Sequence, residues 1–203
     1  MPLLERLRSS SALWSQEEEE EEENIASPRT PKQWHRNLNL EIKMGLKEEF
    51  RSAWLSGNSF DELLERFVIE TASRASGLWR LQENHLILVG FGWASDMPQD
   101  VSLGFQAATR RVPLDQIGLG IVKAAVTAKP AIGRRDPKES GLDGSATWIA
   151  KFGANTSLAV PIRQKETNRI SGVLAVSTSA FVEEDDALWQ TLIGLADELG
   201  SAA

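Results

Sequence analysis

The segment "TSLAVPIRQKETNRISGVLAVST", Thr156–Thr178, consists of two apolar runs joined by a polar stretch. Apolar runs of this length on either side of polar turn residues are typical of a β-hairpin. We place the turn at Gln164–Asn168, so that Arg163 pairs with Arg169. This hairpin is the part of the chain around which the rest of the fold can be predicted.

The two faces of the hairpin differ in side-chain size, because residues alternate between the faces of a strand. We expect the face with large residues to pack under helices. The opposite face leaves two hypotheses open. Either a helix packs closely on it or solvent covers it, or the space above it is a ligand cavity whose hydroxyl groups supply polar contacts. The large face carries Leu158, Val160, Ile162, Ile170, Gly172 and Leu174, with Leu158 opposite Leu174, and the small face carries Ser157, Ala159, Pro161, Ser171, Val173, Ala175 and Ser177.

The first part of the chain differs from the hairpin in composition. Residues 1–31 contain a serine cluster, the glutamate run Glu17–Glu23 and the sequence "SPRTP". They have too few apolar residues to form a core, so we expect them to be disordered. Residues 32–56 are predicted to form an N-terminal helix, and residues 57–203 a single domain. The helix prediction rests on apolar residues at every fourth position, which are Trp34, Leu38, Ile42, Leu46, Phe50 and Trp54.

Upstream of the hairpin we predict a helix, two strands and an irregular stretch. The helix follows Ser59, whose spacing from Glu62 is that of a capping box. The two strands flank the polar pair "EN", which suits a hairpin turn. The predicted bounds are 60–75 for the helix, 77–82 and 85–93 for the strands, and 94–115 for the irregular stretch.

The remaining elements are a helix, a strand and a short helix before the hairpin, and one helix after it. The first of these helices ends before Pro130, because the residue before a proline disfavours the helical backbone. Acidic residues open the last helix, where they favour the positive end of its dipole. The bounds are 117–129, 131–134, a polar loop at 134–144, 145–153 and 183–200. This order indicates an α+β domain with a mainly antiparallel sheet of about five to six strands.

The composition excludes several kinds of chemistry. The chain has no cysteine, which rules out disulfides, cysteine-ligated metals and a cysteine nucleophile. Its two histidines, His35 and His85, lie on either side of a predicted domain boundary. We therefore expect neither a two-histidine metal site nor a histidine-based catalytic relay.

The charge of the chain is a property of its N-terminal tail. The net charge of -7 equals the charge of the glutamate run Glu17–Glu23, so the rest of the chain has no net charge. We expect neither nucleic acid nor a membrane as a partner, because the domain has no strong field to attract them. No apolar run reaches the ~20 residues of a transmembrane helix, and the first residues lack the apolar segment of a secretory signal. We expect the protein to be cytoplasmic.

The hairpin and the segments around it resemble a GAF domain. The stretch from Thr156 to Leu199 resembles the C-terminal half of that family, in which a strand ending in Val-Pro leads through a polar turn to a Gly-Val-Leu strand and a closing helix. "SGLWRLQENHLILVGFGW" is similar to the family's first hairpin, and "IGLGIVKAAVTAKPAI" to its helix and short strand. The resemblance covers about Ser59 to Leu199 and is weakest at 94–115.

This resemblance implies a small-molecule sensor or regulatory module, with terminal helices on one face of the sheet and a ligand chamber on the other. It also implies a homodimer formed through those helices and a signal passed to an effector protein. Without cysteine, the chain cannot attach a bilin or perform the thiol chemistry of the related free methionine sulfoxide reductases. It also lacks the Asn-Lys, Phe, Asp-Glu signature of members that bind cyclic nucleotides. The ligand is therefore an unidentified small molecule, and no cofactor is predicted.

The candidate ligand-binding residues lie in segments that would border the chamber. Each kind of candidate residue has two interpretations. The glycines of "GLG" either place free N–H groups at a helix start, where anions are favoured, or pack closely on the sheet. The arginines either bind an anionic ligand or are solvated surface residues. The aromatic residues are chamber walls or core filling. The set is Trp93, Phe105, Arg110, Gly118, Gly120, Arg134, Trp148, Phe152, Ser157, Ala159, Ala175 and Ser177.

Two functions are compatible with these patterns. The first is a non-catalytic sensory or regulatory domain that binds a small ligand. The second is an interaction and dimerisation module with a vestigial pocket, in which the acidic tail binds a basic partner. An enzyme is not expected, because no nucleophile, metal set or acid–base pair is visible in the sequence.

Overall fold

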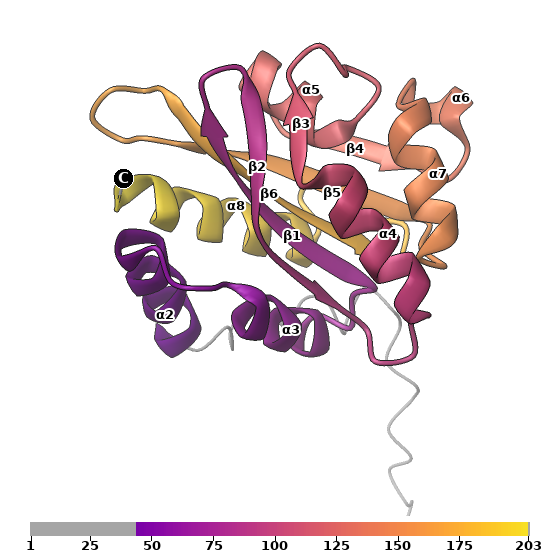
Figure 1. The fold of residues 1–203 in the computed structure, drawn as a ribbon, viewed down its shortest axis with the longest axis horizontal. Helices are drawn as coiled ribbons and strands as arrows, with labels where there is room; N and C mark the ends of the chain where they lie inside the picture. The colour runs from indigo at the N-terminus through magenta and orange to yellow at the C-terminus, as the bar shows by residue number, and fades with distance from the viewer. Residues whose placement is uncertain (1–43, 203) are drawn as a thin grey trace, which may run out of the picture.

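The structure, a computed structural model, describes residues 44–202 (Figure 1). The predicted tail, residues 1–31, and the first part of the predicted N-terminal helix, residues 32–43, lie outside the described residues. Within the described range, no helix has both the length and the apolar character needed to cross a bilayer.

The domain is built on one six-stranded sheet in which every neighbouring pair of strands is antiparallel. The strand order is β3-β2-β1-β6-β5-β4, so the first and last hairpins lie side by side at its centre. This is the α+β architecture predicted from the order of elements. The strands are β1 (Ala75–Gln82), β2 (His85–Trp93), β3 (Arg111–Pro113), β4 (Ala131–Arg134), β5 (Thr156–Arg163) and β6 (Ile170–Thr178).

The hairpin β5–β6 has the predicted faces but not the predicted register. Leu158 pairs with Val176 instead of Leu174. Part of the shift comes from a longer turn, because Arg163 pairs with Ile170, and the rest from a bulge after that pair. Beyond the bulge the pairing is shifted by an even number of residues, so the side chains of 157–162 and 172–177 keep their predicted faces, whereas Ile170 pairs with Arg163 instead of Ile162.

One face of the sheet is covered by α2 (Met44–Ser56), α3 (Asp61–Glu70) and α8 (Ala187–Ser201), which lie below the sheet in Figure 1. These helices and the large face of the hairpin form one hydrophobic core. The part of the predicted N-terminal stripe that is described, Leu46, Phe50 and Trp54, is buried in it.

On this face α3 lies very close to β2. An added Cβ atom at Gly92 would overlap the backbone of Leu64. The carboxylate of Asp61, at the start of α3, accepts the backbone N–H of Phe91 at 2.9 Å. There is no space for even a methyl group between the helix and the strand at this point.

The opposite face is covered by α4 (Gln99–Thr109), α5 (Gly120–Thr127) and α7 (Asp143–Lys151), with the short α6 (Pro137–Ser140) beside α7. A second core lies under these helices and combines aromatic rings with small strand residues, among them Ala75, Ala159 and Ala175. The contrast between the two cores matches the two faces predicted for the hairpin.

The prediction was wrong for two loops that contain regular structure. The stretch 94–115 contains α4 and β3. The buried positions of α4 are Ser102, Phe105 and Thr109, and two polar residues among three hide the apolar period of a helix. The loop predicted at 134–144 contains α6 and the start of α7.

The helix predicted at 60–75 is shorter than expected. It ends at Glu70, and the chain turns through Ala72, whose φ is 49°. The predicted capping box does not form, because the hydroxyl of Ser59 donates to the carboxylate of Asp61 at 3.1 Å and accepts the N–H of Asp61 at 3.3 Å.

Candidate functional site

A cavity of about 50 Å³ lies between the centre of the sheet and the helices α4, α5 and α7. Strands β1, β5 and β6 form its floor, and β2 and the helices form its walls. It is lined by Ala75, Ser76, Gly77, Trp79, Phe91, Phe105, Thr109, Leu119, Ile121, Ser145, Trp148, Ile149, Phe152, Ser157, Ala175, Val176 and Ser177.

The floor consists of two rows of side chains that cross the sheet. Each row runs through small residues on β5, β6 and β1 and ends in an aromatic residue on β2. The small residues recess the surface of the sheet, and Phe91 stands beside the recess as part of its wall. The rows are Ser157, Ser177, Ala75 and Trp93 in one, and Ala159, Ala175, Gly77 and Phe91 in the other.

Aromatic rings form a connected wall around the cavity, with Phe105 of α4 at its centre. The ring centroid of Phe105 lies 4.8 Å from that of Phe91 and 5.0 Å from that of Phe152. The ring of Trp148, on α7, meets Phe105 edge to face, with the centroids 5.1 Å apart. Tilted and edge-to-face contacts are favourable for aromatic pairs, so these contacts contribute to the stability of the wall.

The serines that line the cavity differ in where their hydroxyls point. Ser76 lies on the opposite face of the sheet, beside Gly92 and Val176, and donates to a backbone carbonyl of β6 at 3.0 Å. Ser145 accepts a backbone N–H of α5 at 2.8 Å. Ser157 and Ser177 are cross-strand neighbours on the floor, and their hydroxyls make no hydrogen bond within the described part of the chain. These two groups are free to bind a polar atom of a ligand.

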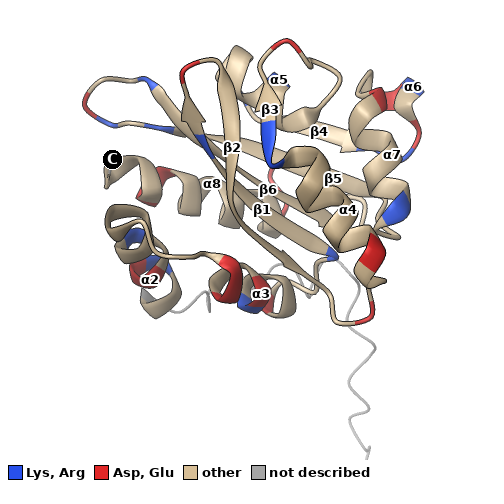
Figure 2. Ribbon diagram, in the orientation of Figure 1, with Lys and Arg blue, Asp and Glu red and all other residues tan. Residues whose placement is uncertain are grey.

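Among the residues that the structure describes, no ionisable side chain lines the cavity. Charged residues gather instead on α2, on α3 and in the loops (Figure 2). Residues 44–202 also contain no group of three or more acidic or histidine side chains that could hold a metal ion. The cavity therefore offers apolar contact and hydrogen bonds.

A second space, a groove of about 370 Å³, lies outside the cavity between the end of α4, the segment before α5 and the start of α7. It shares three side chains with the cavity, those of Thr109, Leu119 and Trp148. The groove therefore adjoins the cavity.

Half of the residues predicted for the site line the cavity, namely Phe105, Trp148, Phe152, Ser157, Ala175 and Ser177. Ala159 is buried in the neighbouring row of the floor. Trp93 lies behind the wall, stacked on Phe91 with the ring centroids 5.7 Å apart.

At the helix start Gly118–Gly120, the N–H of Gly120 is not free to bind a ligand in the cavity. The N–H of Gly120 donates to the hydroxyl of Ser145, and an added Cβ atom at Gly120 would lie 3.4 Å from that hydroxyl. Close packing, one of the two interpretations of this motif, is what the structure shows at Gly120. Gly118 lines the outer groove.

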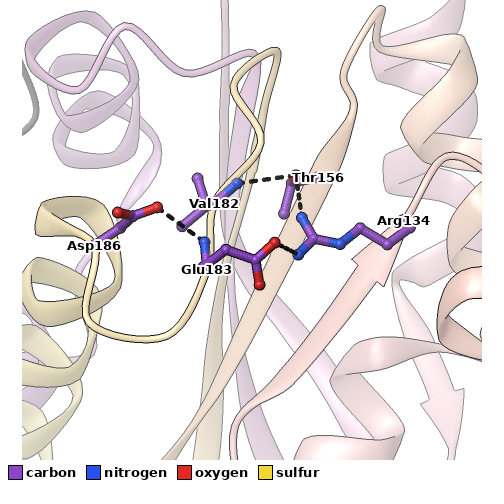
Figure 3. A network of polar contacts seen from close by, with 5 residues as sticks. All are labelled: Arg134, Thr156, Val182, Glu183 and Asp186. Atoms are coloured by element: carbon purple, nitrogen blue, oxygen red, sulfur yellow. Dashed lines mark hydrogen bonds and ion pairs between the residues drawn. The ribbon is translucent and has the colours of Figure 1, made fainter. Parts of the chain in front are cut away.

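Neither predicted arginine lines the cavity. Arg110 is exposed and lines a separate groove at the outer edge of β2. Arg134 points away from the cavity, and its guanidinium donates to Thr156 Oγ1 at 2.9 Å and pairs with the carboxylate of Glu183 at 2.6 Å (Figure 3). Both arginines thus have their contacts outside the cavity.

The same network fixes the connection from β6 to α8 (Figure 3). The backbone N–H of Val182 donates to Thr156 Oγ1 at 3.4 Å, and the N–H of Glu183 donates to the carboxylate of Asp186 at 2.9 Å. Asp186 is the N-cap residue of α8. The helix predicted to begin at Glu183 begins only at Ala187, without an acidic residue in its first turn and without a cap bond from Asp186, so the acidic residues hold the preceding connection.

Arg74 forms hydrogen bonds that connect several segments at one end of the cavity. Its Nε donates to the backbone carbonyl of Phe152 at 2.9 Å, and its Nη1 donates to the carboxylate of Asp96 at 2.7 Å. These bonds tie β1 to the end of α7 and to the loop after β2. The hydrogen bond from Arg74 holds the pKa of Asp96 below its ordinary value.

Sequence reasoning missed several residues that line the cavity. Trp79 and Phe91 lie in the predicted first hairpin, and the alternation of that hairpin would have placed Phe91 on the same face as Trp93. Thr109 was missed because α4 was not predicted. Ser145 was read only as the start of a helix, and no local pattern marks its bond to α5.

No family model and no curated protein sequence matches the chain. Solved structures do match. The GAF domain region of a protein from Geobacter sulfurreducens PCA is 16% identical, with a TM-score of 0.54 over 78% of this chain and 95% of that chain. The nlh2 GAF domain of A. aeolicus in an inactive state is 12% identical, with a TM-score of 0.54 over 83% of this chain and 96% of that chain.

A third match, fRMsr of Staphylococcus aureus in its reduced form, is a methionine sulfoxide reductase with this fold. It is 16% identical, with a TM-score of 0.50 over 82% of this chain and 94% of that chain. Similarity at this level concerns the fold, and the chain has the predicted GAF-like fold. Because the fold occurs in enzymes as well, it does not by itself decide the function.

Proposed function

We propose that this protein is a non-catalytic, GAF-type sensory or regulatory domain that binds a small ligand in the cavity above Ser157 and Ser177. In this proposal it acts in the cytoplasm as a homodimer and passes its signal to a partner protein. The fold supports the class of domain, because the structures it matches include GAF domains. The cavity and its lining support a ligand.

The observation that carries the proposal is the pair of free hydroxyls. Ser157 and Ser177 have no protein partner in the described chain, so their hydroxyls are available to form a hydrogen bond with a polar atom of a ligand. Small-molecule sites are usually apolar, with a few placed polar groups, and this cavity has that composition.

The chemistry of the cavity supports a non-catalytic role. General acid–base catalysis needs a titratable side chain within hydrogen-bond reach of the reacting group, and none of the described lining residues is titratable. A serine nucleophile needs an adjacent base, which Ser157 and Ser177 lack. Thiol chemistry needs a cysteine, and the chain has none.

We place the dimer contact on the layer of α2 and α3. Leu55 and Ile69 are 64% and 76% exposed there, and the resemblance to GAF domains implies a dimer formed through the terminal helices on this face. Replacement Ile69→Glu is expected to convert the dimer to a monomer in light scattering after size exclusion. Val126→Glu, on the opposite helix layer, is the control and leaves the mass unchanged. A dimer that persists in Ile69→Glu contradicts this placement.

The alternative function is an interaction module with a vestigial pocket. The observation that favours it is the cavity volume of about 50 Å³, because most ligand sites have at least about 300 Å³. The two functions differ in whether the purified protein carries or accepts a small molecule.

Native mass spectrometry of the protein purified from cells tests this difference. We expect the wild type to carry a non-covalent adduct, and Ala175→Leu, which fills the cavity, to lack it while its circular dichroism spectrum remains that of a folded protein. A metabolite pool containing a ligand at 100 times its Kd adds ~2.7 kcal/mol of stability. A wild type with neither an adduct nor a thermal shift supports the vestigial pocket.

A further inference from the structure

The cavity and the outer groove are separated by few side chains. Thr109, Leu119 and Trp148 line both spaces. Thr109 is fixed, because its hydroxyl donates to the backbone carbonyl of Phe105 at 2.9 Å. Trp148 is the largest of the three and is only partly buried.

Trp148 is held less firmly than Trp79, the other tryptophan that lines the cavity. The indole N–H of Trp79 donates to the backbone carbonyl of Thr109 at 3.1 Å. The indole N–H of Trp148 makes no hydrogen bond within the described part of the chain. Its ring is held by aromatic contacts such as that with Phe105, and by the ammonium of Lys151, 4.4 Å from the ring centroid. A change of rotamer at Trp148 therefore breaks ring contacts and no hydrogen bond.

The cavity as it stands is too small for a ring. An apolar cavity of roughly 150 Å³ is enough to bind benzene, and this one has about 50 Å³. The groove on the other side of Trp148 has about 370 Å³. Movement of the Trp148 ring joins the two spaces and makes room for a ring-sized molecule that reaches the floor.

Neither space offers a partner for a charged ligand. No residue described as lining the cavity or the groove carries a charge, and an ion buried without a partner pays a large desolvation penalty. Arg134 is paired with Glu183, and Arg110 lines another groove. Lys151 is exposed on α7. The composition of both spaces therefore selects against ions.

We infer that the protein takes an uncharged, ring-sized ligand with at least one hydrogen-bonding group, and that Trp148 is the gate between the outer groove and the hydroxyls of Ser157 and Ser177. This inference rests on the proposed function and adds the chemical class of the ligand and its route.

Three probes with the same ring test the ligand class: benzyl alcohol, benzoate and benzylamine, which are neutral, anionic and cationic at neutral pH. In calorimetric titration and thermal unfolding, benzyl alcohol is expected to bind and raise the Tm, whereas the two ions at the same concentration have no effect. If benzoate or benzylamine binds as tightly as benzyl alcohol, the inferred ligand class is wrong, and the cavity remains a ligand site. No binding of benzyl alcohol also overturns the inference. The adduct measured by native mass spectrometry then still decides the proposed function, because it detects ionised ligands too.

Stopped-flow fluorescence with benzyl alcohol tests the gate. Trp148→Ala is expected to raise the association rate about tenfold, because entry no longer waits for a conformational change. The control Trp189→Ala, on α8 under the other face, leaves the rate unchanged. An unchanged rate in Trp148→Ala overturns the gate. Ala175→Leu is expected to abolish binding, and binding that persists in this variant places the probe in the outer groove and overturns the route.

Discussion

The two faces of the sheet are built from the same strands but are packed to different densities. Under α2, α3 and α8 the strands present large residues such as Leu158, and at Gly92 the helix backbone touches the strand. Under α4, α5 and α7 the same strands present Ser157 and its small neighbours, and aromatic rings stand around a space. Adjacent residues in a strand point to opposite faces, so a single hairpin supplies both a packed core and the floor of a cavity.

The largest expected effect compares one phenylalanine from each face. Phe67 is fully buried in the packed core, and Phe67→Ala is expected to lower the free energy of unfolding by about 3–5 kcal/mol. Phe105 borders the cavity and already lacks neighbours on one side, so Phe105→Ala is expected to cost less than about 3 kcal/mol. Chemical denaturation measures both values. Equal losses contradict the difference in density between the faces.

Two glycines give effects of opposite sign. Gly92→Ala places a methyl group against the backbone of α3 and is expected to cost ~1–3 kcal/mol or more. At Gly104, on α4, an added Cβ atom would lie 3.9 Å from Trp148, an ordinary contact, so Gly104→Ala is expected to gain ~0.5–1 kcal/mol from the higher helix propensity of alanine. Thermal unfolding of the two variants gives the signs, and a loss at Gly104 contradicts the open packing of the cavity side.

Two serines on β1 and β6 give a smaller effect. Ser76→Ala removes a bond to a backbone carbonyl and is expected to cost ~0.5–1.5 kcal/mol. Ser177→Ala removes a hydroxyl without a protein partner in the described chain, so we expect stability to stay the same or rise slightly while ligand affinity falls. A loss of stability in Ser177→Ala equal to that in Ser76→Ala would show that the Ser177 hydroxyl is already satisfied.

The smallest expected effect concerns the Arg74–Asp96 pair at one end of the cavity. Arg74 lowers the pKa of Asp96 below the ordinary value of 3.8, so the folded state binds this proton less readily than the unfolded state. The contribution of Asp96 is present above pH 3.8 and is lost as the pH falls through the lowered pKa. Asp96→Asn is expected to flatten the acid side of the profile of Tm against pH, and Arg74→Met to do the same. A profile unchanged in both variants contradicts the role of this pair.

The faces of the sheet could be predicted from sequence because they depend only on alternation. The register could not be predicted, because the longer turn and the bulge in the β5–β6 hairpin leave no clear sequence pattern. The predicted faces were still correct beyond the bulge, because the turn and the bulge together shift the pairing by an even number of residues. Alternation would also have placed Arg134 correctly. Gly133 lies beside Ser157 on the cavity floor, so the next residue must point to the opposite face.

Other parts of the site were beyond sequence reasoning for physical reasons. α4 was missed because Ser102 and Thr109 occupy buried positions where apolar residues are expected. The role inferred for Trp148 depends on the absence of a hydrogen bond to its indole N–H within the described chain. The spacing of residues in the sequence does not show whether such a bond forms. The free state of Ser177 likewise depends on contacts between strands and helices that are distant in sequence.

Thr156 and Ser157 are consecutive residues of β5 that have different roles on the two faces of the sheet. The first accepts hydrogen bonds from Arg134 and from the connection to α8, and the second faces the cavity. The peptide unit between them is rigid and planar. Because neighbouring residues of a strand face opposite sides of the sheet, two adjacent positions on β5 join the cavity floor to the connection that leads into α8.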